Sequence, residues 1–461
     1  MLGLNDKLRD FAEKGKYIKT AVVGLGQMGL SLISHLNSLK GFKVTAAADK
    51  NIKKLDDLSA VLKLDKLKDI YLYNNQNVIN ILNAKIEDVF RNKYIDESID
   101  VEKIDRETKS GKIVFTNDFR ILPFLKNVDV IVDATGYPEV GAAVSLSALY
   151  GNKHVVTLNV EADVTVGPIL KKIADKKNLI YTLSAGDEPA ALKELYDFAD
   201  GLGFDIICAG KGKNNPLDVY ANPSTLSKYA ASKGSSPKMM TSFVDGTKSM
   251  IEMACISNAT GLIPDCRGMH GVRANIKDLI SVFRLVRDGG ILEKQGVVDF
   301  VIGDLAPGVF LIYSTKNSMV KEILRYLVLG EGPNYLLYRP YHLTSIETPL
   351  SIARAFFDRK PWIMPRGNLI SEIITVAKKD LAAGEIIDGI GGYTVYGLID
   401  LYETAKNQDL LPIGLSQGCI LKVNKKKGEL ISKKDIKFSE NTLLLQLRRL
   451  QDKGDDDDNI K

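Results

Sequence analysis

Short apolar runs alternate with stretches of helical spacing over the first 190 residues. The apolar runs are nearly continuous, as is typical of strands buried on both faces of a parallel sheet, and they occupy residues 18–23, 42–48, 113–118, 128–135, 154–159 and 178–183. Helix-period segments at 30–39 and 139–150 lie between them. This alternation predicts an α/β fold with a Rossmann-type doubly wound parallel sheet.

The pattern changes in three later places. Residues 51–110 have charged, helical spacing, which predicts a mostly helical insertion with a solvated face. Beyond residue 190 we expect a strand at 204–210, a helix in 242–261 capped by Asp245 and stopped by Gly261, a strand pair at 297–315 and an amphipathic helix at 319–329. From about residue 366 short β segments follow one another between turns.

These patterns divide the chain into four predicted parts. They are a Rossmann domain at 1–160 with a helix returning near 345–360, a central α+β domain at 161–340, a small β-rich domain at 366–449 and a disordered acidic tail at 450–461.

Composition limits the function classes. The 461 residues carry 62 basic and 57 acidic side chains, a balance that argues against a nucleic-acid binder. No apolar run approaches the roughly 18 to 20 residues that cross a bilayer, and the first 18 residues have the pattern of an amphipathic helix rather than a signal peptide. Four widely spaced cysteines without C-x-x-C spacing predict reduced thiols and a cytoplasmic protein.

A glycine motif, Gly24-Leu25-Gly26-Gln27-Met28-Gly29, joins the first strand to the first helix. In this motif the first glycine permits the tight turn, the second lets a pyrophosphate approach the backbone, and the third lets helix and strand pack closely. Asp49 follows Gly29 by 20 residues, where a ribose-binding carboxylate belongs. A plain turn is the alternative, but this spacing favours a site for NAD or NADP.

The ends of later strands complete the predicted cofactor site, because ligands bind beyond the carboxyl ends of parallel strands. Asp49 would accept a hydrogen bond from a ribose 2′-hydroxyl and repel a 2′-phosphate. Lys50, Lys53 and Lys54, which follow it, could hold that phosphate. The sequence therefore leaves NAD and NADP open. The predicted cofactor-binding residues are Gly24, Leu25, Gly26, Gln27, Met28, Gly29, Asp49, Lys50, Ala134, Thr135, Gly136 and Asn159.

Taken together, several stretches resemble one family. They are VVGLGQMG (22–29), DATG (133–136), NVEADVTVG (159–167), SAGDEP (184–189), AGKGK (209–213), SFVDGTKSMIE (242–252), YRPYHL (338–343) and GGYTVYG (391–397). They are similar to homoserine-dehydrogenase-like NAD(P)-dependent oxidoreductases with a C-terminal SAF domain, and within these to the 1-deoxy-D-xylulose-5-phosphate reductoisomerase-like group. Homoserine dehydrogenases carry a lysine where this chain has Val160, which argues against homoserine as the substrate.

The resemblance implies a redox step on a small polar carbonyl or hydroxy compound, either with or without a phosphate group. It also implies a homodimer formed through the central region, favours NADP(H), and makes 366–449 a SAF domain. It also makes Lys211 a candidate proton donor or oxyanion stabiliser, and Lys248 a candidate ligand for a substrate anion. A non-catalytic sensor that binds a dinucleotide or a sugar is the alternative from another class.

Charged residues after the later strands are the candidates for catalysis. Lys211 and Lys213 flank a glycine at a strand end, where a lysine can act as general acid if its pKa falls; the bland alternative is a solvated loop. The acidic residues Glu161, Asp163, Asp187 and Glu188 could bind substrate, transfer protons, hold Mg²⁺ or Mn²⁺, or serve only in turns. Ser249 and Glu252 also fit a capping box, which is purely structural. The candidate catalytic set is Lys211, Glu161, Asp187, Lys213 and Lys248.

Overall fold

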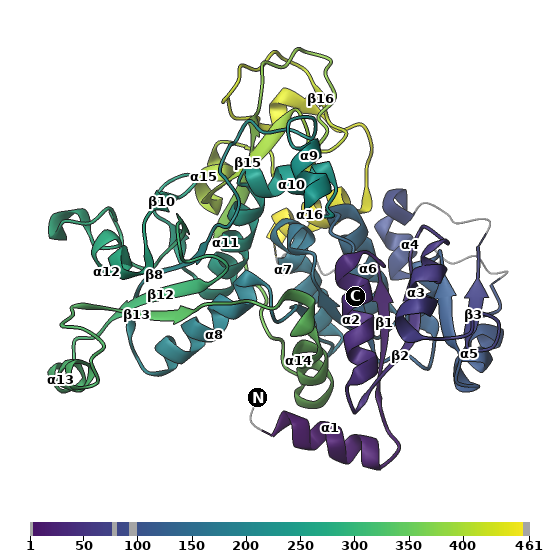
Figure 1. The fold of residues 1–461 in the computed structure, drawn as a ribbon. Coiled ribbons are helices and arrows are strands. Elements are labelled where there is room, and N and C mark those ends of the chain that lie inside the picture. Colours follow the sequence, from purple (N-terminus) through teal and green to yellow (C-terminus); the bar gives the residue numbers. More distant parts are fainter. Residues whose placement is uncertain (1–2, 76–80, 92–98, 455–461) are drawn as a thin grey trace. The chain divides into compact units, whose positions relative to one another are not determined.

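The computed structural model describes residues 3–75, 81–91 and 99–454, and it divides the chain into two compact units. The first unit contains residues 1–187, 343–364 and 441–461, and the second contains 188–342 and 365–440. The chain therefore passes from the first unit to the second and back more than once (Figure 1).

A parallel sheet of seven strands forms the centre of the first unit, in the order β3-β4-β2-β1-β5-β6-β7. Its strands are β1 (Ile18–Val23), β2 (Phe42–Ala48), β3 (Ile70–Tyr73), β4 (Ile113–Thr116), β5 (Val130–Asp133), β6 (His154–Thr157) and β7 (Tyr181–Leu183). The strand order reverses between β1 and β5, which makes the carboxyl end of β1 the switch point of the sheet. The predicted Rossmann-type fold is confirmed.

Helices on this sheet complete the first unit. They are α1 (Leu4–Glu13), α2 (Gln27–Ser38), α6 (Pro138–Tyr150), α7 (Val160–Lys176), α14 (Thr348–Ala353) and α16 (Leu443–Lys453), with a π-helical turn at Arg354–Asp358. The return near 345–360 thus contains α14 and the turn after it, and they contribute Ile352 and Ala353 to the core. Residues 450–453 of the predicted tail belong to α16, and 455–461 lie outside the described residues.

The insertion at 51–110 is helical except for one strand. It contains α3 (Lys54–Leu62), a 3-10 turn at Ile81–Asn83, α4 (Ile86–Phe90) and α5 (Val101–Lys109), while residues 76–80 and 92–98 lie outside the described part. β3 adds a parallel edge strand beside β4 that the helical pattern did not predict. Only Ile70 of its four residues is buried, so the sequence carries little strand periodicity there.

The second unit is built on a mixed sheet in the order β10-β11-β8-β12-β13, with β9 also beside β11. Its strands are β8 (Asp205–Gly212), β9 (Ile263–Pro264), β10 (Val272–Arg273), β11 (Val297–Ile302), β12 (Val309–Ser314) and β13 (Asn334–Arg339). The predicted strand pair at 297–315 does form two strands. They do not pair with each other, because β8 lies between them, parallel to β11 and antiparallel to β12.

Helices and a small β-rich module surround this sheet. The helices are α8 (Glu188–Gly201), α9 (Ser227–Ser232), α10 (Pro237–Val244), α11 (Thr247–Thr260), α12 (Leu279–Val282) and α13 (Ser318–Tyr326). The module contains β14 (Ser371–Ala377) paired with β15 (Val395–Leu401), α15 (Tyr402–Asn407), and β16 (Ile420–Leu421) paired with β17 (Ile436–Lys437).

The expected helix within 242–261 is broken at its start. Gly246, in the left-handed conformation, is the N-cap of α11, so the prediction that Asp245 caps it is wrong. Asp245 ends α10 instead, and its Oδ1 accepts a hydrogen bond from the Thr247 backbone nitrogen at 2.9 Å. Gly261 stops α11 with φ 89°, as predicted. In the described part of the chain, no helix combines the length and the apolar character that crossing a membrane requires.

Candidate functional site

In the glycine turn of the first unit, two glycines have no room for a side chain and the third has free space around it. Gly24 has φ 92°, and a Cβ on it would lie 2.9 Å from the Ala134 backbone. A Cβ on Gly29 would lie 1.9 Å from the Gly24 oxygen. Gly26 has nothing within 4 Å of its Cβ position. Gly24 and Gly29 are therefore needed for packing, and Gly26 leaves free space beside the N-terminus of α2, where backbone N–H groups favour an anion.

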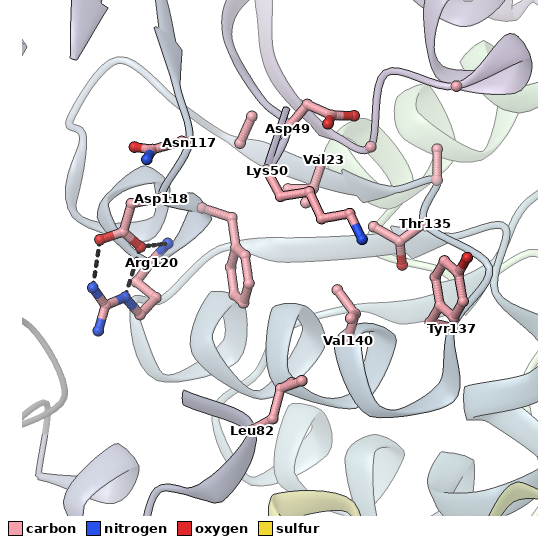
Figure 2. Close-up of a pocket in the computed structure, with 15 residues that line it drawn as sticks. Val23, Asp49, Lys50, Leu82, Asn117, Asp118, Arg120, Thr135, Tyr137 and Val140 are labelled. Carbon is pink, nitrogen blue, oxygen red and sulfur yellow. Dashed lines mark hydrogen bonds and ion pairs between the residues drawn. The ribbon is translucent and has the colours of Figure 1, made fainter. Parts of the chain in front are cut away.

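A cavity of about 390 Å³ adjoins this turn (Figure 2). Six of the predicted cofactor residues line it: Gly24, Gly26, Asp49, Lys50, Ala134 and Thr135. The other six do not. Leu25 and Gly29 are buried, Gln27 and Met28 begin α2, Gly136 follows Thr135, and Asn159 caps α7. A volume of this size lies within the usual range for small-molecule and cofactor pockets.

Asp49 connects the glycine turn to the end of β2. Its Oδ2 accepts a hydrogen bond from the Leu25 nitrogen, and its Oδ1 accepts one from the Asn51 nitrogen, each at 2.8 Å. The side chain of Lys50 extends toward Thr135 and Tyr137 in Figure 2, with its Nζ 6.0 Å from the centre of the Tyr137 ring. Within the described chain Lys50 forms no ion pair. The carboxylate thus has a structural task, and the ammonium remains available to a ligand.

A buried ion pair on the cavity wall was not foreseen. Arg120 donates from Nε and from Nη2 to the two oxygens of Asp118, each at 2.6 Å, and both side chains are 1% exposed. The Asn75 amide, which follows β3, donates to the same carboxylate at 2.8 Å. Asn117 and Asp118 come directly after β4, so the rule that ligands bind beyond strand ends could have identified them.

Asn159 joins the end of β6 and the start of α7 to the loop that follows β5. Its Oδ1 accepts from the Ala162 nitrogen as the N-cap of α7, while its Nδ2 donates to the Tyr137 oxygen at 2.8 Å and to Thr135 Oγ1 at 3.3 Å. Burial raises the pKa of neighbouring Asp133, against the opposing effect of hydrogen bonds from Thr135. Asn159 therefore positions the loop that lines the cavity and does not line it itself.

In the second unit, Lys211 is clamped between two carboxylates. It lies on β8, and its Nζ forms ion pairs with Glu188 at the start of α8 and with Glu252 on α11. Burial alone would lower the pKa of Lys211, but the two carboxylates outweigh burial and raise it. The sequence made Lys211 a general acid only if its pKa were lowered, and its pKa is raised instead. The structure also accounts for Glu252 by this ion pair rather than by a capping box with Ser249.

Lys213 has the environment that was expected at Lys211. Lys213 is two residues after Lys211 and directly follows β8, so the two side chains lie on the same side of the extended chain. It is 5% exposed, its Nζ donates to the Phe243 oxygen at 2.5 Å, and no ion pair to it forms within the described chain. Burial, and then the charge of Lys211, lower the pKa of Lys213 to about 8, against the opposing effect of Glu252 and Asp245.

The remaining catalytic candidates are spread over both units. Lys248 is the second residue of α11 in the second unit. Glu161 and Asp163 are buried in the first turn of α7, where the Tyr181 hydroxyl donates to Asp163 at 3.1 Å, and Asp187 is the last residue of the first unit before α8. A divalent cation on Glu188 and Glu252 would have to displace the Lys211 ammonium that already balances their charge.

A second buried ion pair, between Asp245 and Lys378, lies close to Lys213. Asp245 and Lys378 are both almost completely buried, and Lys378 Nζ lies 2.8 Å from Asp245 Oδ2 and donates to the Gly392 oxygen at 2.9 Å. Burial raises the pKa of Asp245, against the opposing effect of Lys378. The β-rich module thus contributes a cation to the segment between α10 and α11.

Comparisons with known proteins agree with the oxidoreductase class. Residues 186–348 match the family model described as "Oxidoreductase DRL, catalytic domain". No curated protein matches the chain in a sequence comparison. The homoserine-dehydrogenase-like and SAF parts of the resemblance have no counterpart in these matches.

Solved structures share only the fold. A probable dehydrogenase from Thermotoga maritima is 11% identical, with 76% of this chain and 90% of that chain covered and a TM-score of 0.41. A scyllo-inositol dehydrogenase from Lactobacillus casei is 16% identical, with 70% and 76% covered and a TM-score of 0.35. A DOX-P reductoisomerase with fosmidomycin and magnesium is 14% identical, with 51% and 56% covered and a TM-score of 0.34. At these values a shared substrate does not follow.

The family match covers the part of the candidate site that lies in the second unit and leaves out the glycine turn. The match covers β8, α8 and α11, which carry Lys211, Lys213, Glu188 and Glu252, whereas the glycine turn lies outside it. The match confirms the prediction of an enzyme of the oxidoreductase class.

Proposed function

We propose that this chain is an NAD(P)H-dependent oxidoreductase acting on a small polar, phosphorylated carbonyl or hydroxy compound. The observation that carries the proposal is the glycine turn, in which Gly24 and Gly29 are closed by packing while Gly26 opens beside a 390 Å³ cavity. A Cβ would fill the one place in the turn where a pyrophosphate must approach the backbone. The residues present therefore fit a dinucleotide.

The second unit supplies the proton in this proposal. A bound nicotinamide dinucleotide would provide the hydride that adds to the substrate carbon. Lys213 Nζ, with a pKa of about 8, then gives its proton to the carbonyl oxygen, and in the reverse direction the neutral amine takes the proton from the hydroxyl. Lys211 stays charged because Glu188 and Glu252 hold it, and it keeps the pKa of Lys213 low. Lys248 is the proposed contact for a substrate anion.

The nucleotide preference depends on Asp49 and Lys50. Asp118 already balances the charge of Arg120 through a bidentate contact, so Lys50 is the cation on the cavity wall that forms no ion pair within the described chain. We propose that Lys50 binds this phosphate and that the enzyme uses NADP(H), although Asp49 by itself would favour NAD(H).

Binding and turnover test the proposal separately. NADH and NADPH fluorescence titrations should give tight binding by the wild type and none by Gly26→Glu, whose side chain fills the open position. Gly26→Ala is the matched comparison, since its methyl group enters free space and the fold is retained, and by the same reasoning it should weaken binding less than Gly26→Glu does. If Gly26→Glu binds as tightly as the wild type, the cofactor site is elsewhere.

A substrate screen separates an enzyme from a sensor. NADPH oxidation would be followed over deoxyxylulose phosphate, homoserine and related sugar acids. Consumption with a phosphorylated sugar supports a reductoisomerase-like reaction, whereas tight binding with no turnover on the whole series favours the non-catalytic alternative.

The proposal includes the setting in which the enzyme works. We propose a cytoplasmic homodimer whose residues 366–449 correspond to the SAF domain of the resemblance, although residues 441–449 of this range belong to the first unit. The four free cysteines are consistent with a reducing compartment, and the paired strands of β14 to β17 are consistent with a β-rich module.

A further inference from the structure

The insertion reaches the cavity beside the glycine turn at one residue. Among the described residues of the insertion, Leu82 alone lines this cavity, and Figure 2 shows its side chain on the side away from Asp49. With Phe119 and Val140, Leu82 makes part of the lining apolar. An apolar lining suits the flat base of a dinucleotide better than its phosphates. The position of Leu82 therefore affects how well such a base is held.

Two very short helical pieces carry Leu82 and the residues after it. The 3-10 turn has three residues and α4 has five, lengths at which a helix is not stable by itself. On α4, Ile86 and Val89 are buried, and the Phe90 ring stacks on Tyr150 of α6 with 4.8 Å between the ring centroids. These contacts hold α4 on α6, whereas the turn that contains Leu82 comes before them.

The side chain of Gln446, on α16, forms hydrogen bonds at the junction between this turn and α4. Its Oε1 accepts from the Ile86 nitrogen at 2.9 Å, and its Nε2 donates to the Ala84 oxygen at 3.0 Å and to the Asn441 oxygen at 2.9 Å. Ile86 is the first residue of α4, so its N–H has no partner within that helix. Gln446 thereby holds the main chain at two points shortly after Leu82.

A second glutamine on the same helix makes an equivalent pair of hydrogen bonds elsewhere. Gln451 Oε1 accepts from the Ile169 nitrogen at 3.2 Å, and its Nε2 donates to the Thr165 oxygen at 3.3 Å, both on α7. Pro168 lies between these two residues, and a proline inside a helix disturbs the hydrogen bonds around it. Gln446 and Gln451 thus do the same kind of work, but only the segment that Gln446 holds reaches the cavity.

We propose that Gln446 is a positioning residue for the cofactor: through the main chain at 84–86 it holds Leu82 where the base of a dinucleotide contacts it. The C-terminal helix thus takes part in cofactor binding, although none of its described residues lines the cavity. The inference rests on the proposed function, since it requires a nicotinamide dinucleotide to bind beside the glycine turn.

NADPH fluorescence titrations of single and double variants test this role. Gln446→Met keeps the length of the side chain and removes its hydrogen bonds, so the dissociation constant should rise about fivefold or more as Leu82 loses its place. Leu82→Ala should have a similar effect. In the Leu82→Ala background Gln446→Met should add less than about twofold, because two residues that act through one contact are not additive. Full additivity overturns the proposal.

Gln451→Met is the matched control. It removes the same kind of hydrogen bonds from the same helix, so it should lower the thermal midpoint about as much as Gln446→Met does. Its dissociation constant for NADPH should nevertheless stay within about twofold of the wild-type value, because α7 does not line the cavity in the described chain. Equal weakening by both variants, or a Gln446→Met variant that binds as tightly as the wild type, overturns the proposal.

Gln446→Glu covers the case in which Gln446→Met fails to fold. It keeps an acceptor for the Ile86 nitrogen and loses the donor to the Ala84 oxygen, so the dissociation constant should rise about threefold or more. An unchanged value overturns the proposal.

The Gly26→Glu variant separates this inference from the proposed function. If the wild type binds neither coenzyme, or Gly26→Glu binds as tightly as the wild type, the cofactor site is refuted and this inference with it. If Gly26→Glu loses binding while Gln446→Met and Gln446→Glu do not weaken it, the cofactor site stands and only the role of Gln446 is refuted.

Discussion

Replacing Lys213 with methionine is expected to stabilise the protein and abolish proton transfer. The buried ammonium of Lys213 donates to one carbonyl and pairs with no carboxylate in the described chain, so folding places a charge where it is poorly solvated. Methionine has a similar length and no charge. The variant should therefore remove an unfavourable interaction that the enzyme retains for its chemistry.

The magnitude follows from the pKa of Lys213, which burial and then Lys211 lower from 10.5 to about 8. A shift of about 2.5 units corresponds to about 3 kcal/mol. The variant also leaves the Phe243 oxygen without its donor, which costs about 1 kcal/mol. The net gain in the free energy of unfolding at pH 7 is therefore about 2 kcal/mol.

The pH dependence has a definite sign. Between pH 8 and 10.5 the unfolded chain binds the Lys213 proton and the folded chain does not, so the stability of the wild type rises with pH in that window. Below pH 8 the penalty is fully present. The advantage of Lys213→Met should therefore be complete at pH 7 and disappear as the pH approaches 10.5.

Urea unfolding of the wild type and Lys213→Met from pH 7 to 10 measures this difference, and NADPH oxidation measures turnover. Lys211→Met is the matched comparison: two residues away, it should lose about 3 to 5 kcal/mol, because Glu188 and Glu252 would stay buried without their cation. The reasoning is refuted if Lys213→Met is less stable than the wild type at pH 7, or if the difference does not change with pH.

Three further predictions concern the first unit. Gly29→Ala should destabilise the fold by at least about 1 kcal/mol and weaken cofactor binding, since its Cβ would lie 1.9 Å from the Gly24 oxygen; thermal unfolding with and without NADPH checks both. Lys50→Ala should weaken NADPH binding at least tenfold and NADH binding less than twofold, and equal losses in paired titrations would contradict the phosphate contact. Burial, and then Arg359, lower the pKa of His154 to about 4. The free energy of unfolding should therefore be highest above pH 6.5 and fall by up to about 3 kcal/mol as the pH drops to 4. In urea unfolding His154→Gln should lose much of this pH dependence, and an unchanged dependence would count against the assignment.

The parallel strands and the glycine turn could be predicted because their signals are local. A strand buried on both faces is written as a continuous apolar run, and the turn depends on three glycines within six residues. β3 could not be predicted in the same way. It is a short edge strand whose pairing with β4 depends on a segment about 40 residues away, and only one of its four residues is buried.

The roles of the two lysines show where a sequence signal ends. Lys211 and Lys213 stand on either side of Gly212 with the same local pattern, and nothing nearby distinguishes them. The partners of Lys211 come from α8 and α11, 23 and 41 residues away, and they set its pKa high. Only the assembled sheet and helices decide which lysine is a fixed cation and which one can titrate.

The cavity beside the glycine turn likewise has one side that the local sequence predicts and one that depends on tertiary contacts. Its glycine side depends on backbone geometry, which three closely spaced glycines encode directly. Its other side is formed by Asp118 and Arg120, which follow β4. The carboxylate of Asp118 accepts hydrogen bonds from Arg120 and from Asn75, which follows β3. Because the insertion supplies Asn75, a change in the insertion would alter this wall of the cavity before it altered the glycine turn. Sequence motifs therefore predict the glycine side of the cavity, whereas tertiary contacts build its opposite wall.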